Sequence, residues 1–163
     1  MTAEPQDLQF PDEEFRRVQP VPGAPHPFTL PGVQTFALPT GVRVYLAEQH
    51  ALPIISMDLN FDGGSITDPH GKEGLASVCA AMLTEGTEHL DKLAYSETLA
   101  DIASQVNAYA VDDVEGVGLA TLTKHFAATF AGFADTLCAP GLRASDLDRM
   151  NKRRVEALRK LRG

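Results

Sequence analysis

Apolar and polar positions alternate with a period of two in several stretches of the chain, which predicts β-strands. Residues 42–47 and 54–62 both show this alternation. Residues 35–38 precede a Pro-Thr-Gly turn, so we expect them to pair with 42–47 as a hairpin. Two further strands are predicted at 106–111 and 117–123, on either side of an acidic turn. The glycines early in the second of these favour close backbone approach.

The period changes to that of a helix in residues 71–87. Apolar residues recur there at the spacing of one amphipathic stripe: Leu75, Val78, Cys79, Met82 and Leu83. At about 100° per residue, Ser77, Ala80 and Ala81 fall on the opposite face. Gly86 is expected to end this helix as its C′ glycine.

Three more helices are predicted, at 92–104, at 124–138 and after a Pro-Gly stop, the last with Ser145 as its N-cap. The buried stripe of the last helix is expected to contain Leu147, Met150, Leu158 and Leu161. The strands are joined by hairpins rather than by single crossover helices. This order predicts an α+β fold, with a largely antiparallel sheet and helices packed on one face.

Residues 1–33 differ in composition from the rest, since they hold seven of the 11 prolines. Proline disfavours helices and inner strands, so we expect an extended arm. Its apolar anchors would be Phe10, Phe15, Val18 and Phe28. Residues 34–163 are long enough to form a globular core.

The net charge of −8 argues against nucleic acid as a partner. The charge is uneven, because residues 149–163 hold seven of the 14 Lys and Arg but only one of the 22 acids. The rest of the chain therefore carries a formal charge of −14. The basic end is interpreted either as a solvated helix face, with cations suited to the C-terminal end of the helix dipole, or as a docking surface for an acidic partner.

No apolar run approaches the length of a membrane span, and the N-terminus lacks the features of a signal peptide. We therefore expect a soluble protein, whose compartment stays open between the cytoplasm and, if a leader was removed, the periplasm. Cys79 and Cys138 lie on apolar faces of predicted helices, where buried free thiols are expected, although a disulfide stays open. None of the five histidines belongs to a recognisable zinc-binding motif, and His70, with Asp68 and Glu73 nearby, is interpreted as a solvated loop residue.

Several short segments occur in a characteristic order. They are LPTGVRVYL at 38–46, DGGS at 62–65, DPHGKEGLA at 68–76, MLTEGT at 82–87 and NAYA at 107–110. This order resembles the pitrilysin/insulinase family of zinc metallopeptidases, which includes the mitochondrial processing peptidases. The resemblance runs from about Phe36 to Gly163. In active members of the family, the helix after Gly-Leu-Ala carries the inverted zinc motif H-x-x-E-H.

The positions that match this motif read Ser-Val-Cys-Ala-Ala at 77–81, so both histidines and the catalytic glutamate are absent. Zinc needs imidazole, thiolate or carboxylate ligands, whereas Ser77 and Ala81 supply at best one weak hydroxyl. Ala80 has no group that acts as a general base. The family's third ligand, a glutamate on a later helix, aligns near Ala157, next to Glu156, and one carboxylate would not rebuild the site. We therefore expect no catalytic residue, no metal and no cofactor in this chain.

The resemblance implies that residues 34–163 are the N-terminal part of a peptidase-like domain, incomplete at the C-terminus. It implies a non-catalytic subunit or fragment that pairs with an active subunit carrying H-x-x-E-H and zinc, and that helps to enclose a peptide substrate. Two alternatives stay open. One is an active zinc metalloendopeptidase with ligands outside this chain, and the other is a free-standing peptide- or protein-binding module.

Overall fold

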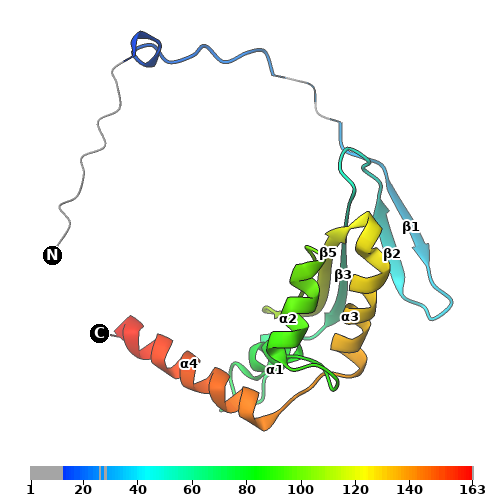
Figure 1. Cartoon of the computed structure of the whole chain (residues 1–163), viewed down its shortest axis with the longest axis vertical. Coiled ribbons are helices and arrows are strands. Elements are labelled where there is room, and N and C mark those ends of the chain that lie inside the picture. Colours follow the sequence, from blue (N-terminus) through cyan, green and yellow to red (C-terminus); the bar gives the residue numbers. More distant parts are fainter. Residues whose placement is uncertain (1–12, 26, 28, 163) are drawn as a thin grey trace. The chain divides into compact units, whose positions relative to one another are not determined.

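The computed structural model describes residues 13–162 except 26 and 28 (Figure 1). The chain divides into two compact units, Met1–Gln49 and His50–Gly163. In the described part, no helix has both the length and the apolar character that a bilayer crossing requires.

The first unit contains a β-hairpin of strands β1 (Val33–Ala37) and β2 (Arg43–Ala47), as predicted. The N–H of Gly41 closes the turn by donating to the carbonyl of Leu38 over 2.9 Å. The alternation at 42–47 is typical of a strand with one buried face, but both strands are exposed except for the half-buried Val44. A two-stranded hairpin has no second layer of its own to cover its apolar face.

The described part of the predicted arm contains a short 3-10 turn at Glu14–Arg16. Two of the expected anchors are largely exposed, Phe15 at 69% and Val18 at 72%. The other two, Phe10 and Phe28, lie outside the described residues, as does the arm before residue 13.

The second unit is built on a three-stranded antiparallel sheet of β3 (Ile54–Asp62), β4 (Gln105–Ala110) and β5 (Val114–Leu122). The order is β3-β5-β4, so β5 is central. Leu119 of β5 is opposite both Met57 of β3 and Val106 of β4. Side chains of this parity form one apolar face of the sheet, as the alternation predicts.

Four helices belong to this unit: α1 (Leu75–Leu83), α2 (Lys92–Asp101), α3 (Phe126–Cys138) and α4 (Ala144–Arg162). The helix α1 contacts β4 and α3 contacts β5 (Figure 1). The core contains Val117, Leu119 and Phe133, packed against Leu83 of α1 and Leu137 of α3. The predicted α+β fold, with helices against one face of an antiparallel sheet, is therefore confirmed.

Buried hydroxyl groups connect the helices to the sheet. Those of Ser104, Thr121 and Thr129 lie 2.7–2.9 Å from one another and join the start of β4, the strand β5 and the helix α3. The hydroxyls of Tyr95 and Thr136 lie 2.6 Å apart and join α2 to α3. Because each buried hydroxyl has a partner, these groups do not carry the cost of unsatisfied polar atoms.

Two predicted helix ends are wrong. The helix α1 ends at Leu83 with Thr84 as its C-cap, so Gly86 lies beyond the C′ position, in a β-bridge with Asp91. The helix α4 begins at Ala144, which places Ser145 inside its first turn rather than at the N-cap. Sequence patterns locate helix termini less well than helix interiors, because capping depends on local backbone geometry.

Two predictions of burial are also wrong. Met150 is buried and Leu147 is half-buried, but Leu158 is 61% exposed and Leu161 is 84% exposed. The C-terminal half of the apolar stripe on α4 is therefore uncovered within the described residues. Cys79 and Cys138 are free thiols, as expected, but both are exposed.

Candidate functional site

The helix α1 starts at a cap that the apolar pattern did not reveal. The carboxylate of Asp68 accepts hydrogen bonds from the N–H of Gly74 over 2.6 Å and from the N–H of Ala76 over 2.8 Å. Both donors belong to the N-terminal end of the helix, where N–H groups lack partners within the helix and where the helix dipole favours a negative charge. The loop before α1 thus fixes the position of the helix.

The three residues that match the zinc motif, Ser77, Ala80 and Ala81, differ in their surroundings. Ala80 is buried, whereas Ser77 and Ala81 are half-buried. The guanidinium Nη2 of Arg154 on α4 donates to the carbonyl of Ser77 over 3.2 Å and to its hydroxyl over 3.3 Å. The fold therefore brings α4 against the degenerate end of α1, although Ala157 itself is exposed.

None of these side chains offers a strong ligand or a titratable base. Across the described residues, no group of three His, Cys, Asp or Glu side chains is placed to hold a metal ion. His70, the loop histidine, is fully exposed, and its Nδ1 lies 3.6 Å from the carboxylate of Glu73.

A buried carboxylate joins α4 to the segment after α1. The side chain of Glu85 is 7% exposed and forms ion pairs with Lys92 and, over 2.5 Å, with Arg149. Burial opposes ionisation of Glu85, but the hydrogen bonds from Lys92 and Arg149 outweigh it and lower its pKa. Arg149 also contacts Asp146 over 2.8 Å, so the first turns of α4 belong to the same network.

Arg143, which directly precedes α4, also connects α4 to the segment after α1. The Nη2 of Arg143 donates to the carbonyl of Thr87 over 2.6 Å and to that of Leu90 over 3.3 Å. Its Nη1 is buried without a hydrogen bond and lies 3.8 Å from Asp146. Sequence reasoning missed Glu85 and both arginines as a structural group, because the partners lie more than 50 residues apart in the chain.

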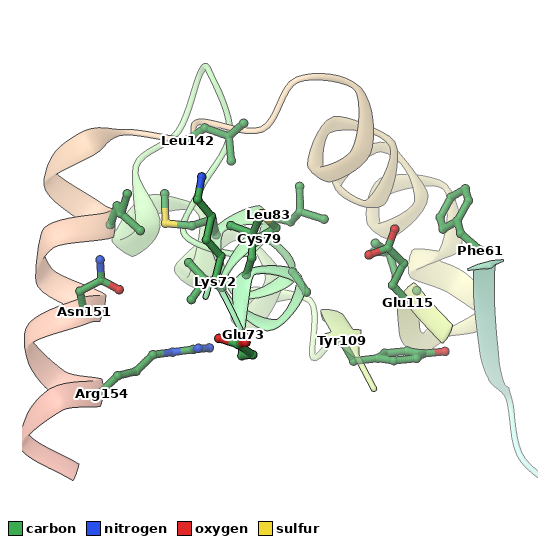
Figure 2. A pocket seen from close by; sticks show the side chains of 18 of the residues that line it. Phe61, Lys72, Glu73, Cys79, Leu83, Tyr109, Glu115, Leu142, Asn151 and Arg154 are labelled. Carbon is green, nitrogen blue, oxygen red and sulfur yellow. The ribbon is translucent and has the colours of Figure 1, made fainter. Parts of the chain in front are cut away.

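An open cavity of about 920 Å³ lies between α1, α4 and the end of the sheet (Figure 2). Its apolar wall includes the whole predicted stripe of α1: Leu75, Val78, Cys79, Met82 and Leu83. Figure 2 shows Asn151 and Arg154 reaching into it from α4, with Phe61 and Glu115 at the opposite end. The stripe was correctly read as one face, but much of it lines an open cavity instead of a closed core.

In the sheet beside this cavity, β3 and β4 are the two edge strands, and one face carries closely packed polar side chains. Within the described residues, β4 pairs only with β5, so its outer edge is unpaired. A Cβ at Gly116 would lie 2.8 Å from the hydroxyl oxygen of Tyr109, and a Cβ at Gly118 would collide with the carboxylate of Asp58. The predicted close approach of another backbone is therefore not observed, because the nearest atoms to both glycines belong to side chains of β3 and β4.

Comparisons with known proteins agree with the fold described above. One solved structure, described as an inactive domain of peptidase M16 from Pseudomonas fluorescens, is 26% identical, with a TM-score of 0.69. It covers 74% of this chain, which in turn covers 30% of that one. A protease from Helicobacter pylori is 19% identical with a TM-score of 0.62, over 72% of this chain and 29% of its own, and shows the fold alone.

The chain thus spans about 30% of the length of these solved structures. No curated protein matches it. The sequence model of the insulinase family, peptidase family M16, matches residues 43–161, which is most of the chain. This chain therefore belongs to the insulinase (M16) family.

Proposed function

We propose that this chain is a non-catalytic M16 subunit or fragment that pairs with an active, zinc-bearing subunit and helps to enclose a peptide substrate. The observation that carries the proposal is the chemistry of α1. Where active members have H-x-x-E-H, this helix has Ser77 bound by Arg154, a buried Ala80 and Ala81. The related structure from Pseudomonas fluorescens is itself described as an inactive domain, which favours the same reading.

A hydrolytic zinc site needs three protein ligands, a water and a base near that water. Ser77 is the one zinc-motif position with a polar side chain, and its hydroxyl is occupied by Arg154. The Ala80 methyl cannot take a proton from water. We propose that zinc is supplied only by the partner, through its own H-x-x-E-H helix.

The fold retains surfaces that suit an extended peptide. The unpaired edge of β4 presents backbone N–H and C=O groups to which a peptide can add as a further strand. Tyr109, near the end of β4, also lines the apolar cavity. A peptide along this edge would therefore have room for apolar side chains beside its backbone contacts.

The first experiment is an affinity pull-down of this chain from lysate of its source, with every co-purifying polypeptide sequenced. The proposal expects a homologue with H-x-x-E-H, and zinc-dependent cleavage of a peptide library by the pair but not by this chain alone. Stoichiometric zinc binding together with peptidase activity by this chain alone would favour an active enzyme. A stable chain that recovers no such homologue would favour the binding module.

A further inference from the structure

We propose that the guanidinium of Arg154 takes the place of a metal ion at the zinc-motif positions of α1, where it joins α4 to α1 and keeps divalent cations out. The inference deepens the proposed function by naming the group that prevents zinc binding in this chain. It rests on the proposed function only in taking α1 as the helix that carries zinc in active members. The contact between Arg154 and Ser77 carries it, together with the chemistry of arginine.

The side chain of Arg154 extends from α4 to a zinc-motif position. Its Nη2 donates to the carbonyl of Ser77 over 3.2 Å and to the hydroxyl oxygen of Ser77 over 3.3 Å, and Figure 2 shows it directed toward α1. Arg154 is half-buried, whereas its neighbours Arg153 and Val155 are exposed. Ala157, the position that the resemblance aligns with the third ligand, is also exposed. The contact of α4 with the motif therefore belongs to position 154.

This contact uses acceptor oxygens of Ser77 without opening the helix. In an α-helix the carbonyl of Ser77 accepts the N–H of Ala81, which leaves one lone pair of that oxygen for a second donor. The hydroxyl of Ser77 is the one polar side-chain group at the three zinc-motif positions, and its oxygen accepts from a cationic donor. A metal ion would have to displace Arg154 before it could use this oxygen as a ligand.

The charge of Arg154 opposes a second cation at this place. A guanidinium in a protein stays protonated, so the charge is permanent. Among the ion pairs of the described residues, none involves Arg154. Glu73 lines the same cavity, but its carboxylate already accepts the N–H of Gly71 over 2.9 Å. At a separation of about 5 Å, repulsion between a single and a double positive charge lowers the affinity for the divalent ion about tenfold, even with the dielectric constant of water.

Arg154 also makes a connection that a metal ion shared by two helices would make. Arg143 and Arg149 attach the start of α4 to the segment after α1. Arg154 lies more than one turn further along α4 and binds α1 itself. A zinc ion with ligands on both helices would join them through the metal, whereas here one side chain joins them by two hydrogen bonds. The two helices are thus connected without a metal.

The experiment is a zinc titration by isothermal calorimetry at neutral pH, in a variant that can bind the ion. Ser77→His/Ala81→His, the two-histidine variant, supplies two imidazoles one helical turn apart and keeps the carbonyl of residue 77 as an acceptor for Arg154. Adding Arg154→Met removes the guanidinium and should raise the zinc affinity at least about tenfold. Adding Arg159→Met is the matched control, because it removes a positive charge from an exposed position of α4 outside the cavity. It should change the affinity less than about threefold, and circular dichroism checks that each variant is folded.

Urea unfolding of the otherwise wild-type chain tests the connection between the helices. Arg154→Met should lower the folding equilibrium constant about tenfold, because two partly buried hydrogen bonds from a charged donor are lost, whereas Arg159→Met should leave it nearly unchanged.

Two results overturn the exclusion of metal by Arg154. One is an equal zinc affinity of the two-histidine variant with and without Arg154→Met, and the other is an absence of zinc binding in both. A folding equilibrium constant that Arg154→Met leaves unchanged overturns the connection between α1 and α4. These measurements need no partner chain, so the pull-down tests the proposed function separately.

Discussion

The buried carboxylate of Glu85 offers the sharpest test of how α4 is held. In Glu85→Gln the side chain keeps its shape but loses its charge, so Lys92 and Arg149 lose their anionic partner. Charge-assisted hydrogen bonds contribute about 1.5–3 kcal/mol each when buried. The side chains of Lys92 and Arg149 are 41% and 46% exposed, so water compensates part of that loss.

The burial of Glu85 and the partial exposure of Lys92 and Arg149 together set the size of the expected loss of stability. A fully buried ion pair costs about 3–5 kcal/mol to break, and an exposed pair costs less than about 1 kcal/mol. The Glu85 pairs lie between these limits, so we expect Glu85→Gln to lower the free energy of unfolding by about 2 kcal/mol. For a chain of this size the melting temperature should fall by roughly 4–8 °C. Urea unfolding at neutral pH measures the free energy directly.

The pH dependence gives an independent check. The pKa of Glu85 is lowered in the folded chain from 4.5, so its ionisation stabilises the fold above that value and the contribution is lost as the pH falls through the lowered folded pKa. The stability difference between wild type and Glu85→Gln should therefore shrink as the solution is acidified below about 4.5. Glu88→Gln, at an exposed carboxylate three residues on, is the matched control and should have little effect. A Glu85→Gln variant as stable as Glu88→Gln would refute the reasoning.

Three further predictions concern α1 and the turn beyond it. Asp68→Ala should destabilise the chain by about 1–2 kcal/mol in urea unfolding, because the N–H groups at the start of α1 lose their acceptor. Gly86→Ala should cost about 2 kcal/mol or more by the same assay, because its φ is +114° and a Cβ would lie 2.6 Å from the carbonyl of Leu90. Ser77→His/Ala81→His should bind zinc by calorimetry more tightly than the wild type, since two imidazoles one helical turn apart can share an ion.

The sequence was sufficient to locate most strands and helices and to predict their order along the chain. Alternation located β3, and the 3.6-residue period located α1 and identified its apolar stripe. These features depend on neighbours a few residues apart, so the pattern records them. The prediction that Ser77 and Ala81 occupy the family's histidine positions has the same basis, because a short motif has fixed spacing. The strand predicted at 117–123 begins earlier, at Val114, so part of the predicted acidic turn belongs to β5.

Contacts between distant segments could not be read in this way. A stripe such as Leu75 to Leu83 shows which residues share a face but not what covers that face, and here a cavity lies beside it. The pairing of Glu85 with Arg149 depends on how α4 returns across the fold. Charged residues at such positions look like ordinary surface residues in the sequence, and only the three-dimensional contacts reveal that one of them is buried.

The attachment of α4 has a consequence for motion. Arg143, Asp146 and Arg149 hold its first turns in place, whereas the apolar residues Val155, Leu158 and Leu161 beyond Arg154 are exposed. Amide hydrogen exchange should therefore become progressively faster toward the C-terminal end of the helix, as in a segment that frays from one end.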